Sequence, residues 1–372
     1  MICNRAGVPG AGRPPTSLRR PGRRRLLALG LPTAWGAAAV TYKLSCPLAQ
    51  QQGLGARAVT SALFFAVGTG LILHVRRALL RELRQARRVA GAAQSALLRP
   101  LPPRIGGLSV AAAQLSADRG AAIGGDLYEV VATEHGVRVV MGDVRGHGIA
   151  AIGTAAAVLG SFREAAHDEA DLGGVLRRLE RALGRHLRQR SHGEHPPAGP
   201  GPESDSPVAE EFVTVVVLEI GADGEVRALN CGHPWPYVLS GRGVEPLARA
   251  DPLPPLGPFP LPPGLPVRHC GQLQPGEALF LHTDGAEDVR DARGRFFPLS
   301  KVLAETLRRH PSVVPHAVLG SVFTALLHHT RGAPSDDIAL LALRNDRSRR
   351  PASGSPGATR PAGTHARPTP HL

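Results

Sequence analysis

The chain has 372 residues, of which 42% are hydrophobic but only 4% aromatic, so a core must be built mainly from Ala, Val and Leu. The net charge of +14 lies at the two ends: residues 1–104 hold 17 Lys/Arg and one acidic residue (+16), residues 344–372 hold six Arg and one Asp (+5), and residues 105–343 therefore carry −7. An acidic central region argues against a nucleic-acid-binding protein, so we expect no nucleic-acid partner. The four cysteines include no Cys-x-x-Cys pair, which fits a reducing compartment.

Two apolar segments, residues 26–44 and 58–75, lie near the N-terminus. Each approaches the roughly 20 residues that a helix needs to cross a bilayer. Arginines cluster before the first segment and after the second, which places both flanks in the cytoplasm. A cleavable signal peptide followed by one anchor, or a buried helix of a soluble protein, would also fit such segments.

We therefore predict a basic cytoplasmic N-terminus (residues 1–25) and a hairpin of two transmembrane helices with a short external loop (residues 26–75). The protein is expected at the cell membrane, with its remaining residues in the cytoplasm.

Residues 76–99 are predicted to form a linker helix that ends at the prolines from Pro100 onward. Leucine and alanine recur there at alternating steps of four and three, which is the spacing of a coiled coil. These positions are Leu79, Leu83, Ala86, Ala90, Ala93 and Leu97. Such a helix can form a homodimer, although a plain amphipathic helix fits equally well because half of the positions are alanine.

Residues 100–345 are predicted to form one folded domain. Strand patterns cover residues 108–115, 127–133, 137–141, 212–220, 225–230, 237–240, 278–282 and 338–343, and helix patterns cover residues 149–166, 172–187, 300–308 and 312–328. Blocks of strands and helices without strict alternation indicate an α+β domain and argue against a Rossmann fold. Residues 191–211 are predicted to be a disordered insertion, and residues 346–372 a disordered tail.

Four aspartates stand at predicted strand ends: Asp126, Asp143, Asp284 and Asp336. Asp126 and Asp143 flank a predicted hairpin, whose antiparallel strands should bring the two side chains together. A single Asp-Gly pair is usually only a turn, but four such positions predict a cation site. Oxygen ligands without a His or Cys cluster favour Mg²⁺ or Mn²⁺, and two such ions can align water against a phosphoryl group. The pattern therefore indicates phosphoester hydrolysis.

Several motifs occur in an order typical of one family. They are residues 97–103, Gly124–Tyr128, Gly142–Gly148, Phe212–Thr214, Asn230–Pro234, Thr283–Gly285 and Asp336–Asp337. On these residues the chain resembles the bacterial sporulation-phosphatase (SpoIIE/RsbU-type) branch of the metal-dependent, type 2C (PPM) protein phosphatases.

The resemblance implies a four-layer α-β-β-α sandwich, in which two antiparallel sheets are flanked by helices. It implies that Asp126 and Asp143 bridge two divalent cations, Mn²⁺ or Mg²⁺, that the Val144 carbonyl completes one shell, and that Asp284 and Asp336 hold the second ion. The reaction is then hydrolysis of phosphoserine or phosphothreonine by metal-activated water, without a nucleophilic side chain. The expected partner is a phosphorylated regulatory protein, often of the anti-anti-sigma type.

Some residues depart from the family pattern: Glu129 stands in place of Asp, His282 in place of Tyr, and Cys231 in place of Ala. None of them is an expected ligand. His147 and His233 lie near the expected site in Gly-rich turns, where a structural role is equally consistent. Cys231 and His233 could suggest zinc, but a structural zinc site needs four ligands.

Two other functions compete with the phosphatase. One is a catalytically silent membrane receptor that binds a phosphoprotein; the four retained aspartates argue against it, because like charges held together cost stability. The other is a membrane-tethered DNA-binding regulator, which the acidic central region disfavours.

Overall fold

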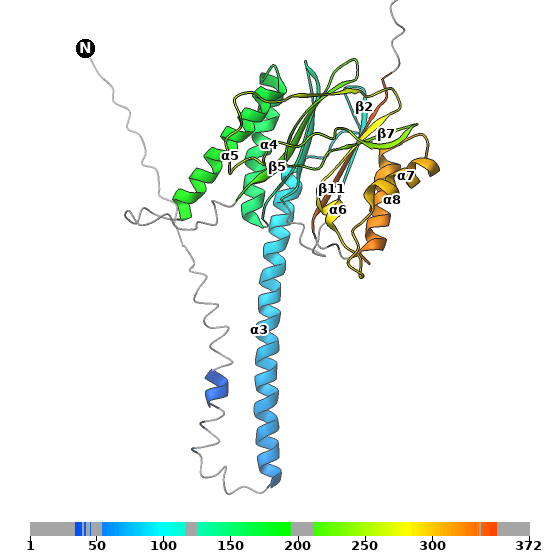
Figure 1. The fold of residues 1–372 in the computed structure, drawn as a ribbon. Helices are drawn as coiled ribbons and strands as arrows, with labels where there is room; N and C mark the ends of the chain where they lie inside the picture. The colour runs from blue at the N-terminus through cyan, green and yellow to red at the C-terminus, as the bar shows by residue number, and fades with distance from the viewer. Residues whose placement is uncertain are drawn as a thin grey trace, which may run out of the picture. The chain divides into compact units, whose positions relative to one another are not determined.

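The computed structural model describes residues 34–38, 41, 45, 54–115, 125–146, 148–194, 211–332, 334 and 336–347 (Figure 1). The chain divides into two units, Met1–Ala86 and Arg87–Leu372, and the described strands lie in the second. The predicted N-terminus (residues 1–25), most of the first transmembrane segment, most of the insertion and nearly all of the tail lie outside the described residues.

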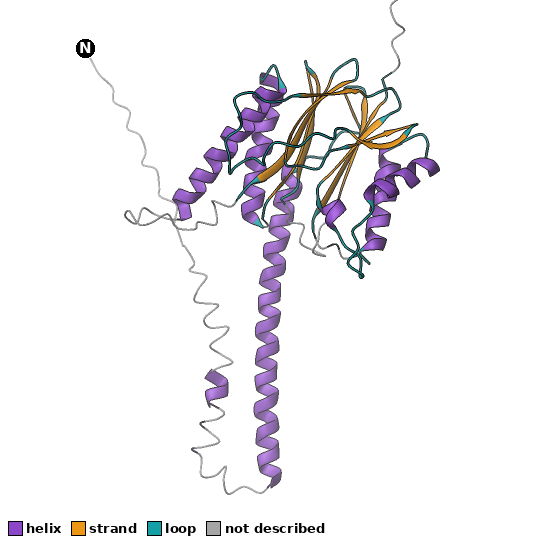
Figure 2. Cartoon of the chain, viewed as in Figure 1, coloured by secondary structure: helices purple, strands orange, loops and turns teal. Residues whose placement is uncertain are grey.

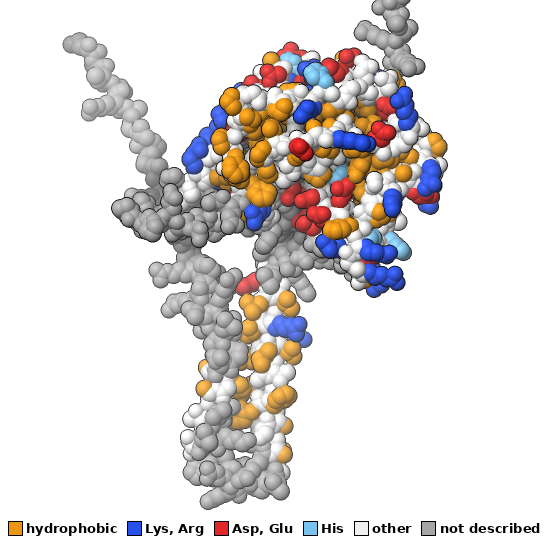
Figure 3. Space-filling model, viewed as in Figure 1, with side chains coloured by type: hydrophobic (Ala, Val, Ile, Leu, Met, Phe, Trp, Pro, Cys, Tyr) orange, Lys and Arg blue, Asp and Glu red, His pale blue; other side chains and the backbone are white. Residues whose placement is uncertain are grey.

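One helix, α3 (Leu54–Leu97), covers both the second predicted transmembrane segment and the predicted linker helix. No proline interrupts these residues, and the helix ends at Leu97, three residues before Pro100. Its segment Ser61–Glu82 is 22 residues long and is apolar enough to cross a membrane. Apolar side chains such as Phe65 and Ile72 are exposed on this segment. Figure 3 shows hydrophobic side chains along the surface of this helix.

Two antiparallel sheets form the centre of the second unit (Figure 2). The five-stranded sheet has the order β3 (Leu127–Thr133), β4 (Gly136–Val144), β5 (Val213–Ile220), β6 (Glu225–Cys231) and β9 (Arg268–Gln272). The six-stranded sheet has the order β1 (Arg104–Ile105), β2 (Leu108–Leu115), β11 (Ile338–Asn345), β10 (Ala278–His282), β7 (Tyr237–Ser240) and β8 (Gly243–Pro246).

Helices cover the outer face of each sheet. The helices α4 (Ile149–Asp168) and α5 (Leu172–Glu194) pack on the five-stranded sheet, and α6 (Gly285–Asp288), α7 (Leu299–Arg309) and α8 (Pro315–His329) pack on the six-stranded sheet. Three apolar clusters fill the spaces between the resulting four layers. The α+β class and the layered sandwich are therefore confirmed. A central strand such as β5 is a continuous apolar run because both of its faces are buried.

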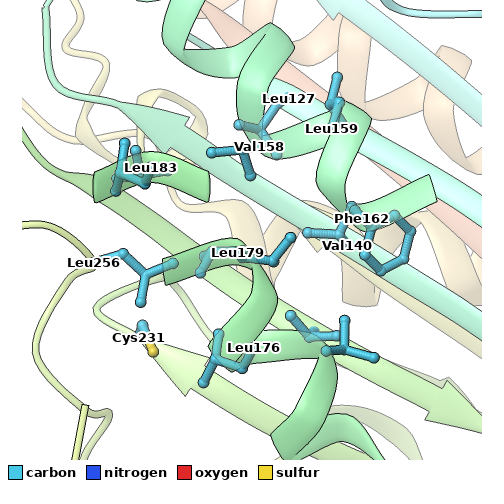
Figure 4. Packing of buried hydrophobic residues seen from close by; sticks show 14 of the residues in the cluster. Leu127, Val140, Val158, Leu159, Phe162, Leu176, Leu179, Leu183, Cys231 and Leu256 are labelled. Carbon is cyan, nitrogen blue, oxygen red and sulfur yellow. The ribbon is translucent and has the colours of Figure 1, made fainter. Parts of the chain in front are cut away.

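The cluster between α4, α5 and the five-stranded sheet is built almost entirely from Leu, Val and Ala, as the composition predicts (Figure 4). Phe162 is its one buried aromatic residue, and it lies with Leu159 and Val140. Cys231 belongs to the same cluster, where burial raises the pKa of its thiol to about 12. Cys231 is therefore part of the packing of this apolar core.

The structure contains elements that the sequence patterns did not predict: the strands β1, β8 and β9 and the short helix α6. Strand β7 lies in the six-stranded sheet, where it pairs with β10 and β8. The sequence analysis missed β9, whose residues are mostly exposed and carry no apolar alternation. Helix α5 continues to Glu194, four residues into the predicted insertion.

Candidate metal centre

The strand register brings the four predicted aspartates to one region. Leu127 pairs with Gly142, so Asp126, just before β3, lies beside Asp143 near the end of β4. In the other sheet, His282 at the end of β10 pairs with Leu340 of β11. Asp284, after β10, and Asp336, before β11, therefore lie at the same edge of that sheet.

Three of these aspartates, Asp143, Asp284 and Asp336, line a cavity of about 370 Å³. It is lined by Gly125, Asp143, Val144, Arg145, Gly146, Phe212, Thr214, Asp284, Asp336 and Asp337. Asp126 lies beneath it and is only 4% exposed. Figure 3 shows acidic side chains gathered in this part of the surface, beside α6.

Thr283 connects the two sheets below the cavity. Its hydroxyl donates a hydrogen bond to Asp126 Oδ2 (3.3 Å) and accepts one from the main-chain N–H of Ala339 (2.9 Å). Asp284 caps α6, because its Oδ1 accepts the N–H of Gly285 (2.9 Å). These contacts hold Asp126 and Asp284 in place from opposite sheets.

Two glycines allow the backbone to pass close to the aspartates. A Cβ at Gly125 would lie 2.2 Å from the Val144 carbonyl oxygen and 2.8 Å from Asp143 Oδ1. A Cβ at Gly285 would lie 2.1 Å from the Asp337 carbonyl oxygen. Any larger residue would push these strand ends apart, which explains why glycine precedes Asp126 and follows Asp284.

Burial and mutual repulsion perturb the carboxyl groups. Burial and then the neighbouring Asp143 raise the pKa of Asp126 well above its usual range. Burial, followed by Asp284, Asp336 and Asp337, raises the pKa of Asp143 to about 7, although a hydrogen bond with Asp126 opposes this shift. Burial also raises the pKa values of Asp284 and Asp336. Acidic groups held together at this cost mark a functional site more often than a structural one.

The donor set suits a hard divalent cation, because the ionisable ligand atoms at the cavity are carboxylate oxygens. Within the described residues, no three His, Cys, Asp or Glu side chains converge closely enough to hold one ion. Main-chain oxygen and water would therefore complete each shell, and Mg²⁺ in particular keeps several waters when it binds to proteins. A cation here would also remove the repulsion that raises the pKa values.

In EDTA, we expect the protein to lose stability as the pH rises from about 4 to above 7. A carboxyl group with a raised folded pKa contributes stability that is fully present below its unfolded pKa of 3.8, and this is lost as the pH passes the folded pKa, about 7 for Asp143. The loss is at most about 4 kcal/mol, or roughly 10 °C in Tm. Thermal unfolding of the full-length chain at about pH 5 and about pH 8 measures it. Mn²⁺ should remove most of the difference, and an unchanged Tm in EDTA would contradict the prediction.

Two residues discussed from the sequence lie away from the cavity lining. Glu129 is buried and forms an ion pair with Arg163 of α4 (2.6 Å), so its replacement of Asp does not change the carboxylates of the site. His233 lies behind the lining, where its Nδ1 is 3.1 Å from the Thr214 hydroxyl. Burial and His282 lower the pKa of His233 to about 3. His147 lies outside the described residues.

The sequence analysis did not assign Arg145, Phe212, Thr214 or Asp337 to the site, although all four line the cavity. Thr214 could have been found from the strand register, because it pairs with Asp143 in the β4–β5 ladder. Phe212 and Arg145 continue the same β4–β5 ladder beyond its last pair, because the N–H of Arg145 donates to the Phe212 carbonyl (2.9 Å). The ladder therefore places both residues beside the cavity as well.

Comparison with known proteins supports these observations. The family model described as Stage II sporulation protein E (SpoIIE) matches residues 133–346, more than half of the chain, with Asp126 outside the match. The SiaA-PP2C domain of Pseudomonas aeruginosa is similar in fold, with a TM-score of 0.54 and 18% identity over 72% of this chain and 98% of that chain.

Two further solved structures are similar to this chain, with lower TM-scores. The RsbU and RsbW domains of Rv1364c from Mycobacterium tuberculosis have a TM-score of 0.49 and 23% identity, over 64% of this chain and 60% of that chain. The PP2C domain and regulatory fragment of SpoIIE from Bacillus subtilis have a TM-score of 0.47 and 14% identity, over 64% and 63%. The chain thus covers less than two thirds of the length of each of these two proteins. From the family match, the chain belongs to the Stage II sporulation protein E (SpoIIE) family.

Proposed function

We propose that this chain is a membrane-anchored, metal-dependent phosphatase that hydrolyses phosphoserine or phosphothreonine on a regulatory protein of the anti-anti-sigma type. The observation that carries this proposal is that Asp143, Asp284 and Asp336 line one cavity at the ends of two sheets, while burial and their charges raise the pKa of Asp126.

Asp126 and Asp143 would lie between two Mn²⁺ or Mg²⁺ ions, with the Val144 carbonyl completing one shell and Asp284 and Asp336 holding the second ion. When bound, such ions act as Lewis acids and lower the pKa of a bound water. The chain contributes oxygen ligands at fixed positions, because Thr283 and Gly285 hold two of the carboxylates by hydrogen bonds.

The Cys231 thiol is buried in the apolar core, away from the cavity lining. The Thr214 hydroxyl lines the cavity and lies 3.1 Å from the Nδ1 atom of the buried, neutral His233. We assign the attack to a metal-activated water because carboxylate oxygens dominate the lining.

Membrane anchoring has support from the described part of the first unit. Residues 34–38 of the first apolar segment are helical, and the ring of Trp35 lies against Phe64 of α3, with centroids 5.5 Å apart. Trp35 also lies against Gly68, where a Cβ would be 3.7 Å from the indole. Contact between the two apolar segments is what a transmembrane hairpin requires. The arginines on both outer flanks favour a cytoplasmic catalytic domain.

The experiment is dephosphorylation of a phosphoserine-bearing anti-anti-sigma protein by carbonate-washed membranes of cells that produce the full-length chain. We expect Mn²⁺-dependent phosphate release that EDTA stops, and none from a phosphotyrosine peptide. Membranes with Asp143→Asn serve as the control. Binding of the phosphoprotein without phosphate release would favour the silent receptor, whereas activity found only in the soluble fraction would refute the anchoring alone.

A further inference from the structure

One positive side chain stands among the acidic residues of the cavity. Of the described residues that line it, four are aspartates and only Arg145 is basic. Arg145 directly follows Val144 at the end of β4, and its side chain is exposed at the cavity mouth. It therefore lies one residue beyond the proposed metal-ligand carbonyl.

Phe212 holds this arginine in position. The guanidinium carbon of Arg145 lies 5.2 Å from the centroid of the Phe212 ring, within the range of a cation–π contact. The backbone N–H of Arg145 donates to the Phe212 carbonyl oxygen (2.9 Å), so both ends of the residue are fixed to the same neighbour. Gly146 then takes φ +117, which turns the chain sharply just after Arg145.

Phe212 is itself supported from behind. Its neighbour Val213 pairs with Leu256, and Gly257 packs so closely that a Cβ there would be 3.4 Å from the Phe212 Cα. The ring is half-buried and lines the cavity. Phe212 is therefore a supported platform for the guanidinium, so little side-chain entropy is lost when the arginine binds an anion.

The charges of the site decide what Arg145 can bind. Two divalent cations would balance four of the five carboxylates of Asp126, Asp143, Asp284, Asp336 and Asp337, and a phosphomonoester brings about two further negative charges. Arginine presents a planar fork of donors that matches phosphate oxygens in pairs.

We propose that Arg145 binds the non-bridging phosphate oxygens of the phosphoserine or phosphothreonine substrate at the mouth of the cavity, with Phe212 fixing its orientation. This inference rests on the proposed phosphatase function and adds the residue that recognises the phosphate.

The stacked pair alone does not carry the proposal, because the same pair occurs elsewhere. Arg290 lies 4.0 Å from the centroid of Phe296, both residues are exposed, and neither lines the cavity. The position of Arg145 among the carboxylates is what distinguishes it. Arg290→Ala is therefore a matched control, because it also removes an arginine that stacks on a phenylalanine ring but does so outside the cavity.

The test measures competitive inhibition by inorganic phosphate, together with KM and kcat for p-nitrophenyl phosphate, using the full-length chain with Mn²⁺ in detergent. For Arg145→Ala we expect the Ki of phosphate and the KM to rise about 10- to 100-fold, while kcat changes less than about threefold. Arg145→Lys should recover part of the loss, since lysine keeps the charge but not the paired donors. Arg290→Ala should match the unsubstituted protein.

Three results would overturn the proposal. The first is an unchanged Ki in Arg145→Ala. The second is an equal rise in Arg290→Ala. The third is a rise in the Mn²⁺ concentration for half-maximal activity in Arg145→Ala that is large enough to explain the whole rise in Ki and KM. Arg145 would then act by positioning the Val144 carbonyl for the metal and not by binding phosphate. If the unsubstituted protein showed no turnover, the phosphatase proposal would fail, and calorimetric titration of the Mn²⁺-loaded protein with phosphate would still decide the role of Arg145.

Discussion

Asp143→Asn is expected to lower the metal-dependent kcat of the full-length protein by about a thousandfold or more, which corresponds to about 4 kcal/mol of transition-state stabilisation. The substitution keeps the size of the side chain but removes the charge that a bridging ligand needs. Asp284→Ala should have a similar effect, because it removes a carboxylate from the opposite sheet. Hydrolysis of p-nitrophenyl phosphate and of a phosphoserine peptide, with Mn²⁺, Mg²⁺ or EDTA, measures both.

Asp288→Asn is the matched control for these substitutions. Asp288 lies on α6 close to Asp284, but it is exposed and does not line the cavity. We expect its kcat to stay within about threefold of the unsubstituted value. Asp143→Asn should also raise the Tm in EDTA at alkaline pH, because it relieves the repulsion on Asp126. Full activity in a folded Asp143→Asn or Asp284→Ala protein would refute the assigned metal centre.

Arg138→Met is expected to destabilise the folded domain by about 3–5 kcal/mol, or roughly 10 °C in Tm. Arg138 on β4 is fully buried, and its Nε donates to Glu219 Oε2 on β5 (2.8 Å). Its Nη1 donates to the carbonyl of Ala166 (2.9 Å) near the C-terminus of α4, where carbonyls lack helical partners. The substitution would leave both the buried carboxylate and the helix end without this donor.

Arg227→Met tests whether burial causes this effect. Arg227 contacts the same carboxylate, with Nη2 3.0 Å from Glu219 Oε1, but its side chain is 37% exposed. Its loss should cost less than about 1 kcal/mol. The double substitution Arg138→Met/Glu219→Met should be less destabilising than Arg138→Met alone, because no buried charge remains unpaired. Thermal unfolding of the three variants measures these differences, and equal costs for the two arginines would contradict the prediction.

Local patterns in the sequence were enough for most elements of the catalytic domain. The apolar runs at residues 127–133 and 137–141, joined by Glu134, His135 and Gly136, predict the observed hairpin of β3 and β4. A hairpin is a local structure, so its turn residues and period of two set its register. For the same reason the proximity of Asp126 and Asp143 followed from the sequence.

The meeting of Asp284 and Asp336 with Asp126 depended on the packing of the two sheets. Thr283, which joins the sheets by bonding Asp126, is 157 residues from it in the chain. Alternation along a strand shows which side chains share a face, but it does not say which sheet the strand joins. This is why only the tertiary structure shows that β7 pairs with β10 and β8.

The sequence by itself therefore determined the α+β class, the motif-bearing strand ends and the oxygen-rich chemistry of the four aspartates. Only the tertiary structure decided that the ends of the two sheets meet at one cavity and that Arg138 is buried against the end of α4. Turns and strand patterns are encoded in neighbouring residues, whereas cavities and buried ion pairs arise where distant segments pack together.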